Sequence, residues 1–451
     1  MAAGLTASLA PKVLGGAVAS SARSGPMATQ AALSLGWFGL AGLWLLAAPL
    51  LGVINAPACL GSASDPRLLA LTHAWVLGFL GSATFGGIYQ LLSVAVGEEL
   101  AWPRLAWIHG ALHAVGVPVM VAAFLRGNFS WVAAGGSLVA VGALLASLNM
   151  AVTIGRARTK DAVAWAFGFS AFWLSATVIA GFLLAVNRAH PVLPGNSETW
   201  LKVHAHLGVV GFYLTLLQGA AFRLLPMFTL GDVKNWMRVA SGLGHTQAGL
   251  IGLIFAIAED IPVARIVFGA TIAMGLAMSA SEAWSVIRSR RKRVIDTGVR
   301  AFLSGAGALA VAIVLGLMLA AWPDAGDGFS VSGAVAYGFV AIVGALALAV
   351  GGMMLKIVPF LVWMRRYGPV IGKEPVPLAS KLPSPLLERA WFELHLLGLV
   401  LVLLGLARSE APWLYAGWAT IVAASVASLL NHGRIAGHLW RKNRTLGGNA
   451  V

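Results

Sequence analysis

Long runs of apolar residues alternate with short polar connections along almost the whole chain. The runs are continuous, without the polar–apolar alternation of barrel strands, and this favours helices over a transmembrane barrel. Each run reaches the roughly 20 residues that a helix needs to cross a bilayer. We therefore predict twelve membrane-spanning helices, at residues 31–55, 68–96, 104–125, 131–154, 162–187, 202–228, 237–258, 261–286, 299–321, 331–364, 388–407 and 411–436.

The composition supports an all-α polytopic membrane protein. Of the 451 residues, 59% are hydrophobic and only 10% are charged, whereas a soluble domain carries roughly 25% charged residues. These values exclude a soluble enzyme, and the high apolar content excludes a disordered chain. The single cysteine, Cys59, excludes a disulfide framework, a cysteine-ligated zinc site and an iron–sulfur cluster.

Basic residues are divided unequally between the two ends of the predicted helices. If the N-terminus is cytoplasmic, only 6 of the 31 lysines and arginines fall on the opposite side, and membrane proteins orient with such positive charge inside. We expect an integral protein of a bacterial inner membrane, with both termini cytoplasmic and flexible tails at 1–30 and 441–451. The net charge of +15 then reflects topology. The lipid bilayer is the expected partner and nucleic acid is not, because no soluble basic face is predicted.

The second, sixth and tenth predicted helices share a sequence pattern. His206 follows His73 by 133 residues, and Phe339 follows His206 by the same interval. Glycines recur at this interval, as Gly78, Gly211 and Gly344 and as Gly86, Gly219 and Gly352. The self-similarity predicts three pseudo-symmetric four-helix repeats. Their expected bounds are 31–155, 156–290 and 291–440.

This arrangement resembles the haem–copper oxidase subunit I superfamily. The histidine-bearing segment from Lys202 to Phe212 is most similar to divergent members, such as the cbb3-type catalytic subunit and the NnrS-like haem- and copper-containing membrane proteins. The resemblance implies that His73 ligates a low-spin haem and that His206 or His204 supplies a copper or other metal ligand. It also implies haem b, copper or both as cofactors, and a cytochrome or another membrane subunit as a partner.

The chain departs from the family pattern at the tenth and seventh helices. Two histidines are expected on the tenth helix, but the aligned positions hold Tyr337 and Phe339. The seventh helix carries His245 in place of an adjacent histidine pair. We therefore expect that a complete oxygen- or nitric oxide-reducing binuclear centre is absent.

The histidines of the second and sixth helices lie at similar predicted depths. His73 is six residues past Arg67, and His206 is four past Lys202, which places both within roughly 10 Å of one surface. An ionisable side chain inside a span suggests function. We expect His73 and His206 to share one centre, completed by His204 if the centre holds copper. The alternative is that each histidine bonds a backbone carbonyl near a helix end.

Three further sets of polar residues fall within the predicted spans. The first is a possible second metal or haem site, or else a set of interhelical hydrogen bonds, and comprises His113, His245 and His395. The second either contacts an anion such as a haem carboxylate or extends to the membrane surface, and comprises Gln90, Arg223 and Lys356. The third either pairs ions and carries protons or lies at the inner interface, and comprises Asn149, Glu282 and His432.

Three functions remain open from the sequence. The leading hypothesis is an integral membrane redox protein that binds haem, copper or both. The second is a permease or channel that uses the same fold without a cofactor. The third is an active terminal oxidase or nitric oxide reductase with atypical ligands. Whether the chain is an enzyme stays open, although it would be an oxidoreductase if it is one.

Overall fold

The computed structural model describes residues 26–188, 190–322 and 327–440, and within these ranges every regular element is a helix. Twelve helices of the described chain are long and apolar enough to cross a membrane, so the all-α polytopic class is confirmed. The predicted spans agree with the observed ones to within about six residues. The predicted tails fall largely outside the described residues.

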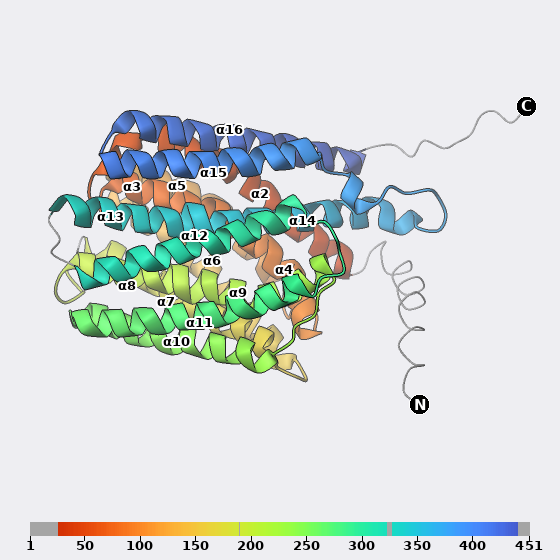
Figure 1. Cartoon of the computed structure of the whole chain (residues 1–451), viewed down its shortest axis with the longest axis horizontal. Coiled ribbons are helices and arrows are strands. Elements are labelled where there is room, and N and C mark those ends of the chain that lie inside the picture. Colours follow the sequence, from red (N-terminus) through yellow and green to blue (C-terminus); the bar gives the residue numbers. More distant parts are fainter. Residues whose placement is uncertain (1–25, 189, 323–326, 441–451) are drawn as a thin grey trace, which may run out of the picture.

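Nine of the twelve spans are single α-helices, and three are interrupted by a π-helical segment (Figure 1). The uninterrupted spans are α2 (Pro26–Ile54), α5 (Pro103–Leu125), α6 (Phe129–Arg156), α7 (Ala162–Asn187), α10 (Trp236–Ala258), α11 (Pro262–Arg288), α12 (Thr297–Ala321), α15 (Pro385–Arg408) and α16 (Ala411–Ala436). The interrupted spans are α3–η2–α4 (Pro66–His73, Ala74–Gly81, Ser82–Val96), α8–η3–α9 (Ser197–His206, Leu207–Leu214, Thr215–Thr229) and α13–η4–α14 (Asp327–Phe339, Val340–Leu346, Ala347–Tyr367).

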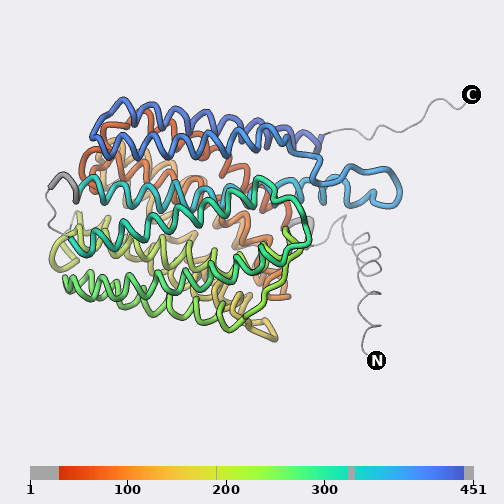
Figure 2. The backbone as a smooth tube through the Cα atoms, viewed as in Figure 1, coloured from red at the N-terminus to blue at the C-terminus, as the bar shows by residue number. Residues whose placement is uncertain are grey.

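The helices lie side by side in one bundle, and spans that are consecutive in the sequence contact each other (Figure 2). Helix α16 packs against α2, which brings the last span beside the first. Helix α2 begins and the short 3-10 helix η7 (Gly437–Trp440) ends at the same end of the bundle, which we call the terminal end (Figure 1). The connection that holds η5 (Gly368–Val370) and η6 (Ala379–Lys381) also projects from this end. Another 3-10 helix, η1 (Ala56–Leu60), lies at the opposite end.

The three π-helical segments lie at corresponding places in the chain. They begin at Ala74, Leu207 and Val340, which are separated by 133 residues, so the interval found in the sequence recurs in the backbone. The three interrupted spans are also the most buried of the twelve. They therefore form the interior of the bundle, and the other spans surround them.

Glycines in the π-helical segments allow the surrounding helices to approach closely. A Cβ on Gly78 would lie 2.4 Å from Trp44, and one on Gly211 would lie 2.8 Å from Trp173. Small residues at helix interfaces allow such contacts in membrane proteins. The repeated glycines of the sequence therefore serve packing between the first and second helix of a unit.

Candidate functional site

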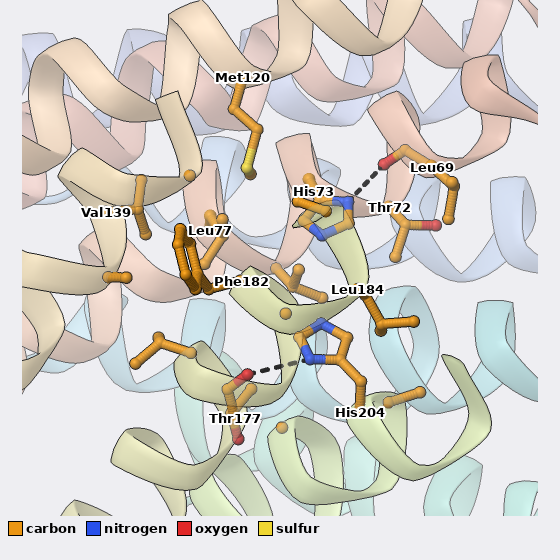
Figure 3. Close-up of a pocket in the computed structure, with 18 of the residues that line it drawn as sticks. Leu69, Thr72, His73, Leu77, Met120, Val139, Thr177, Phe182, Leu184 and His204 are labelled. Atoms are coloured by element: carbon orange, nitrogen blue, oxygen red, sulfur yellow. Dashed lines mark hydrogen bonds between the residues drawn. The ribbon is translucent and has the colours of Figure 1, made fainter. Parts of the chain in front are cut away.

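A cavity of about 430 Å³ lies among α3, η2, α5, α6, α7, α8 and η3. Its wall is mostly apolar, and the imidazoles of His73 and His204 project into it (Figure 3). Among the lining residues only Arg188 and Glu198 carry charge, and both belong to helix ends at the end of the bundle opposite the termini. An apolar cavity of a few hundred Å³ with a few convergent polar groups is typical of a cofactor site.

The two imidazoles face each other across this cavity. Their ring centroids are 6.4 Å apart, and the ring planes differ by 19°. The Nδ1 of His73 donates to the Leu69 carbonyl at 2.7 Å, and the Nδ1 of His204 donates to the Thr177 carbonyl at 3.0 Å. In Figure 3 the second nitrogen of each ring, Nε2, points toward the other ring.

These hydrogen bonds fix the tautomer of both rings. A carbonyl oxygen can only accept, so each Nδ1 carries a hydrogen and each neutral ring keeps a lone pair on Nε2. No described residue hydrogen-bonds the Nε2 of His73 or that of His204. Both lone pairs are therefore free to bind an electrophile placed between the rings, such as a metal ion.

The local sequence places each imidazole. Helix α3 starts at Pro66, directly after Asp65, whose side chain caps the helix, so His73 lies two turns into the span. His73 also packs against Phe124 of α5, with ring centroids 5.0 Å apart. On the other side Gly181 of α7 makes room for His204, because a Cβ there would lie 2.8 Å from the imidazole Cε1.

His206 does not contact His73. The prediction that these two residues share one centre is therefore corrected. The Nδ1 of His206 donates to the Lys202 carbonyl at 2.8 Å. Its Nε2 lies 3.3 Å from the hydroxyl of Tyr337, on α13. Residues two apart point to nearly opposite faces of a helix. His204 therefore faces the cavity, and His206 faces α13.

His113 and His395 hydrogen-bond the backbone of π-helical segments. The Nε2 of His113 donates to the Leu77 carbonyl at 3.1 Å, and the Nε2 of His395 donates to the Val343 carbonyl at 2.9 Å. A π-helix interrupts the regular carbonyl pairing of the flanking α-helix, and a buried carbonyl without a donor is costly. Both histidines thus act as interhelical hydrogen-bond donors.

The second unit satisfies the corresponding carbonyl differently. Thr215 donates to the carbonyl of Val210 at 3.1 Å, and Val210 lies 133 residues from both Leu77 and Val343. His245 instead donates to the Ser241 carbonyl of its own helix. The histidines at positions 113, 245 and 395 do not converge, and within the described parts of the chain no three His, Cys, Asp or Glu side chains form a metal site.

The cations of the second polar set are paired with carboxylates at the terminal end. Arg223 forms an ion pair with Asp161, and Lys356 forms one with Asp296 at 2.7 Å. Asp161 caps α7 and Asp296 caps α12, so each cation joins a π-containing span to the start of the preceding helix. Gln90 holds the corresponding place in the first unit, and its Oε1 has no partner among the described residues.

The third polar set supports the start of a neighbouring helix. The Asn149 side chain accepts from the Trp102 backbone N–H at 3.0 Å, directly before α5. Glu282 accepts from the N–H groups of Lys234 at 2.6 Å and Asn235 at 2.9 Å, directly before α10. Its second carboxylate oxygen forms an ion pair with Arg238 at 3.3 Å. Ion pairing was one of the alternatives that the sequence left open for this set.

In the third unit this role belongs to Asn431 and not to His432. The Asn431 side chain accepts from the Ser384 N–H at 2.7 Å, directly before α15. The Nδ1 of His432 donates to the Ser428 carbonyl of its own helix. The sequence pattern therefore identified the right place in this helix but the wrong residue of the pair.

Two residues of the cavity wall were missed by the sequence reasoning. Gly181 gave no signal, because glycine is frequent throughout the membrane spans. Arg188 was recognised only as a charge near a helix end. Nothing in its sequence context shows that it lines a cavity, because the wall is assembled from six spans.

No protein-family model matches this chain, and no curated protein sequence matches it.

Proposed function

We propose that this integral membrane protein binds one haem b between His73 and His204 and carries single electrons. The observation that supports the proposal most directly is the pair of facing imidazoles, each with Nδ1 bound to a carbonyl and Nε2 directed into an apolar cavity. Donation from the outer nitrogen of a ligating histidine to a carbonyl is a usual feature of metal sites.

The spacing of the rings would allow both imidazoles to ligate one metal ion. With metal–nitrogen bonds of about 2 Å, imidazoles on opposite sides of an ion have ring centres roughly 6 Å apart. The observed separation of 6.4 Å agrees with this value. The cavity volume of about 430 Å³ also suits an organic cofactor better than a bare ion.

The distribution of charge in the wall suits a molecule with an apolar body and anionic groups at one edge. Arg188 lines the cavity at the end of α7 and forms no ion pair with the residues that the structure describes. Its guanidinium lies over the Phe129 ring, 4.8 Å from the centroid. Arg188 would therefore bind a haem carboxylate, while the apolar wall packs against the macrocycle.

Bound haem would supply a one-electron redox couple. His73 and His204 would both ligate this haem, which would leave no room for oxygen to bind it. The chain's own residues would hold the two neutral imidazoles and keep water out. This favours an electron carrier that exchanges electrons with another membrane subunit over an oxidase or nitric oxide reductase. Membership of the haem–copper oxidase subunit I superfamily is part of the proposal, and the recurrence of the 133-residue interval in the backbone supports it.

Copper is the second candidate ligand, because two imidazoles also suit copper and the thioether of Met120 lines the same cavity. The experiment is a dithionite-reduced minus oxidised visible spectrum of the detergent-purified protein, with iron and copper analysis of the same sample. We expect sharp bands of a low-spin haem b and one iron per chain. Copper without iron would support the second candidate, and neither metal would support a cofactor-free permease.

A further inference from the structure

A hydrogen bond joins the two spans that carry the facing histidines. The hydroxyl of Tyr213, in η3, donates to the carbonyl of Val76, in η2. Tyr213 lies nine residues after His204, and Val76 lies three residues after His73. The contact therefore connects the π-helical segments that directly follow α3 and α8.

This hydrogen bond is buried, and the residues around it leave room for it. Tyr213 is buried, with 7% of its surface exposed, and it forms part of the cavity wall. Gly81 leaves room for the contact, because a Cβ there would lie 3.2 Å from the Val76 oxygen and 3.5 Å from the Tyr213 hydroxyl. In a buried apolar setting, loss of this hydrogen bond would leave both the hydroxyl and the carbonyl without a partner, which is costly.

The repeat shows that this tyrosine is not a general feature of the fold. The residues 133 positions before and after Tyr213 are Leu80 and Leu346. Both leucines are fully buried in the other two π-helical segments, so an apolar side chain satisfies the packing at this place. At this place a tyrosine occurs only in η3, the segment that follows His204.

We infer that Tyr213 is a positioning residue that sets the distance between the imidazoles of His73 and His204. The inference rests on the proposed function, since it assigns Tyr213 to the geometry of the same site. By fixing η3 to η2, the hydroxyl holds the imidazoles of His73 and His204 at their observed separation. Without it, the two spans would move apart more easily, and the two histidines would hold a bound haem less firmly.

The test compares Tyr213→Phe with Tyr89→Phe in the haem-loaded protein. Tyr89 is the matched control because it is also buried and its hydroxyl lies 2.8 Å from a histidine nitrogen, but that histidine, His109, lies on α5. For Tyr213→Phe we expect unchanged haem content. We also expect a rise of about two- to tenfold in the fraction of reduced haem that binds carbon monoxide, as the loss of one hydrogen bond predicts. Tyr89→Phe should behave as the wild type.

A second measurement does not need haem. Nitroxide labels at Ala63→Cys, in the turn that precedes α3, and Glu198→Cys, at the start of α8, in a Cys59→Ala background, report the separation of the two spans at the end opposite the termini. We expect Tyr213→Phe to broaden the distance distribution and Tyr89→Phe to leave it unchanged. Equal carbon monoxide binding and equal distances in both variants would overturn the role of Tyr213. A wild-type protein that binds no haem would instead overturn the proposed function, and the label distances would still report on the hydrogen bond between Tyr213 and Val76.

Discussion

The carbonyl partners of His73 and His204 decide what these imidazoles can do. Because each Nδ1 donates to a backbone oxygen, each ring is held in the tautomer that leaves Nε2 unprotonated. A metal could bind there without first displacing a proton. The backbone thus prepares both rings as ligands, and neither ring needs to rotate to meet the other.

The addition of one methyl group at Gly181 tests this arrangement. A Cβ at this position would lie 2.8 Å from the His204 ring, so Gly181→Ala should displace the imidazole and reduce low-spin haem. Gly168, on the same helix, is the control because a Cβ there meets nothing within 4 Å. Alanine is favoured over glycine in a helix by about 1 kcal/mol, so Gly168→Ala should keep the haem and not lose stability. Equal spectra for the two variants would argue against His204 as a ligand.

The sequence could identify the histidines but not their pairing. The 133-residue interval relates His73 to His206 because they hold equivalent places in successive units. Equivalent residues of a repeat lie in equivalent interfaces, and so they need not touch each other. The residue that meets His73 is His204, whose equivalent in the next unit is Tyr337, and Tyr337 meets His206. The pairing depends on how successive units pack, and the interval alone does not contain that information.

At the scale of the elements, hydropathy predicted the spans well but could not show the π-helical segments. A π-helix and an α-helix of the same apolar composition have the same hydropathy, and the difference lies in which carbonyls find donors. In the first and third units the π-helical carbonyls accept from histidines of α5 and α15. In the second unit the carbonyl accepts from a threonine of the same span. His113 and His395 were therefore visible in the sequence as polar residues in a membrane, but their role required the structure.

The ionisation of Asp296 makes the stability of the fold depend on pH. Burial raises its pKa, but hydrogen bonds from Lys292 and Lys356 outweigh burial, so the pKa lies below the ordinary value of 3.8. A carboxylate with a lowered pKa stabilises the fold fully above that ordinary value, and the contribution is lost as the pH falls through the lower folded-state pKa. Asp296→Asn should therefore lower stability at pH 7 by about 1 kcal/mol.

Thermal unfolding in detergent at several pH values checks this prediction. The Tm of Asp296→Asn should lie below that of the wild type at pH 7, and the difference should shrink below pH 4. Asp232→Asn is the control, because Asp232 is exposed and its partner Arg291 is 3.9 Å away. A constant difference across the pH range would show that the ion pairs of Asp296 do not stabilise the fold.

At the scale of the whole molecule, most polar residues of the spans have a structural role. They join helix ends, cap neighbouring helices or satisfy π-helical carbonyls, and they do so at corresponding places in successive units. The Nε2 atoms of His73 and His204 have no such role in the described chain. The number of spans could be predicted because long apolar runs have few alternatives in a membrane. The boundaries of the three units at 155 and 290 stay a prediction.

The orientation of the bundle is a further prediction at this scale. The excess of lysine and arginine at the terminal end predicts that this end is cytoplasmic. In a Cys59→Ala background, a membrane-impermeant maleimide should label Pro191→Cys in cells with a permeable outer barrier. It should label Arg158→Cys only after the inner membrane is broken, since both positions are exposed but lie at opposite ends. The reverse labelling pattern would show the opposite topology.

We propose that His73 and His204, and not His206, hold one haem. The most direct test is the haem content and the reduced minus oxidised spectrum of His204→Ala and His206→Ala, purified alongside the wild type. We predict that His204→Ala loses the low-spin spectrum, because one axial nitrogen is gone, whereas His206→Ala keeps both the spectrum and one haem per chain. Retention of the low-spin spectrum in His204→Ala together with its loss in His206→Ala would contradict the account.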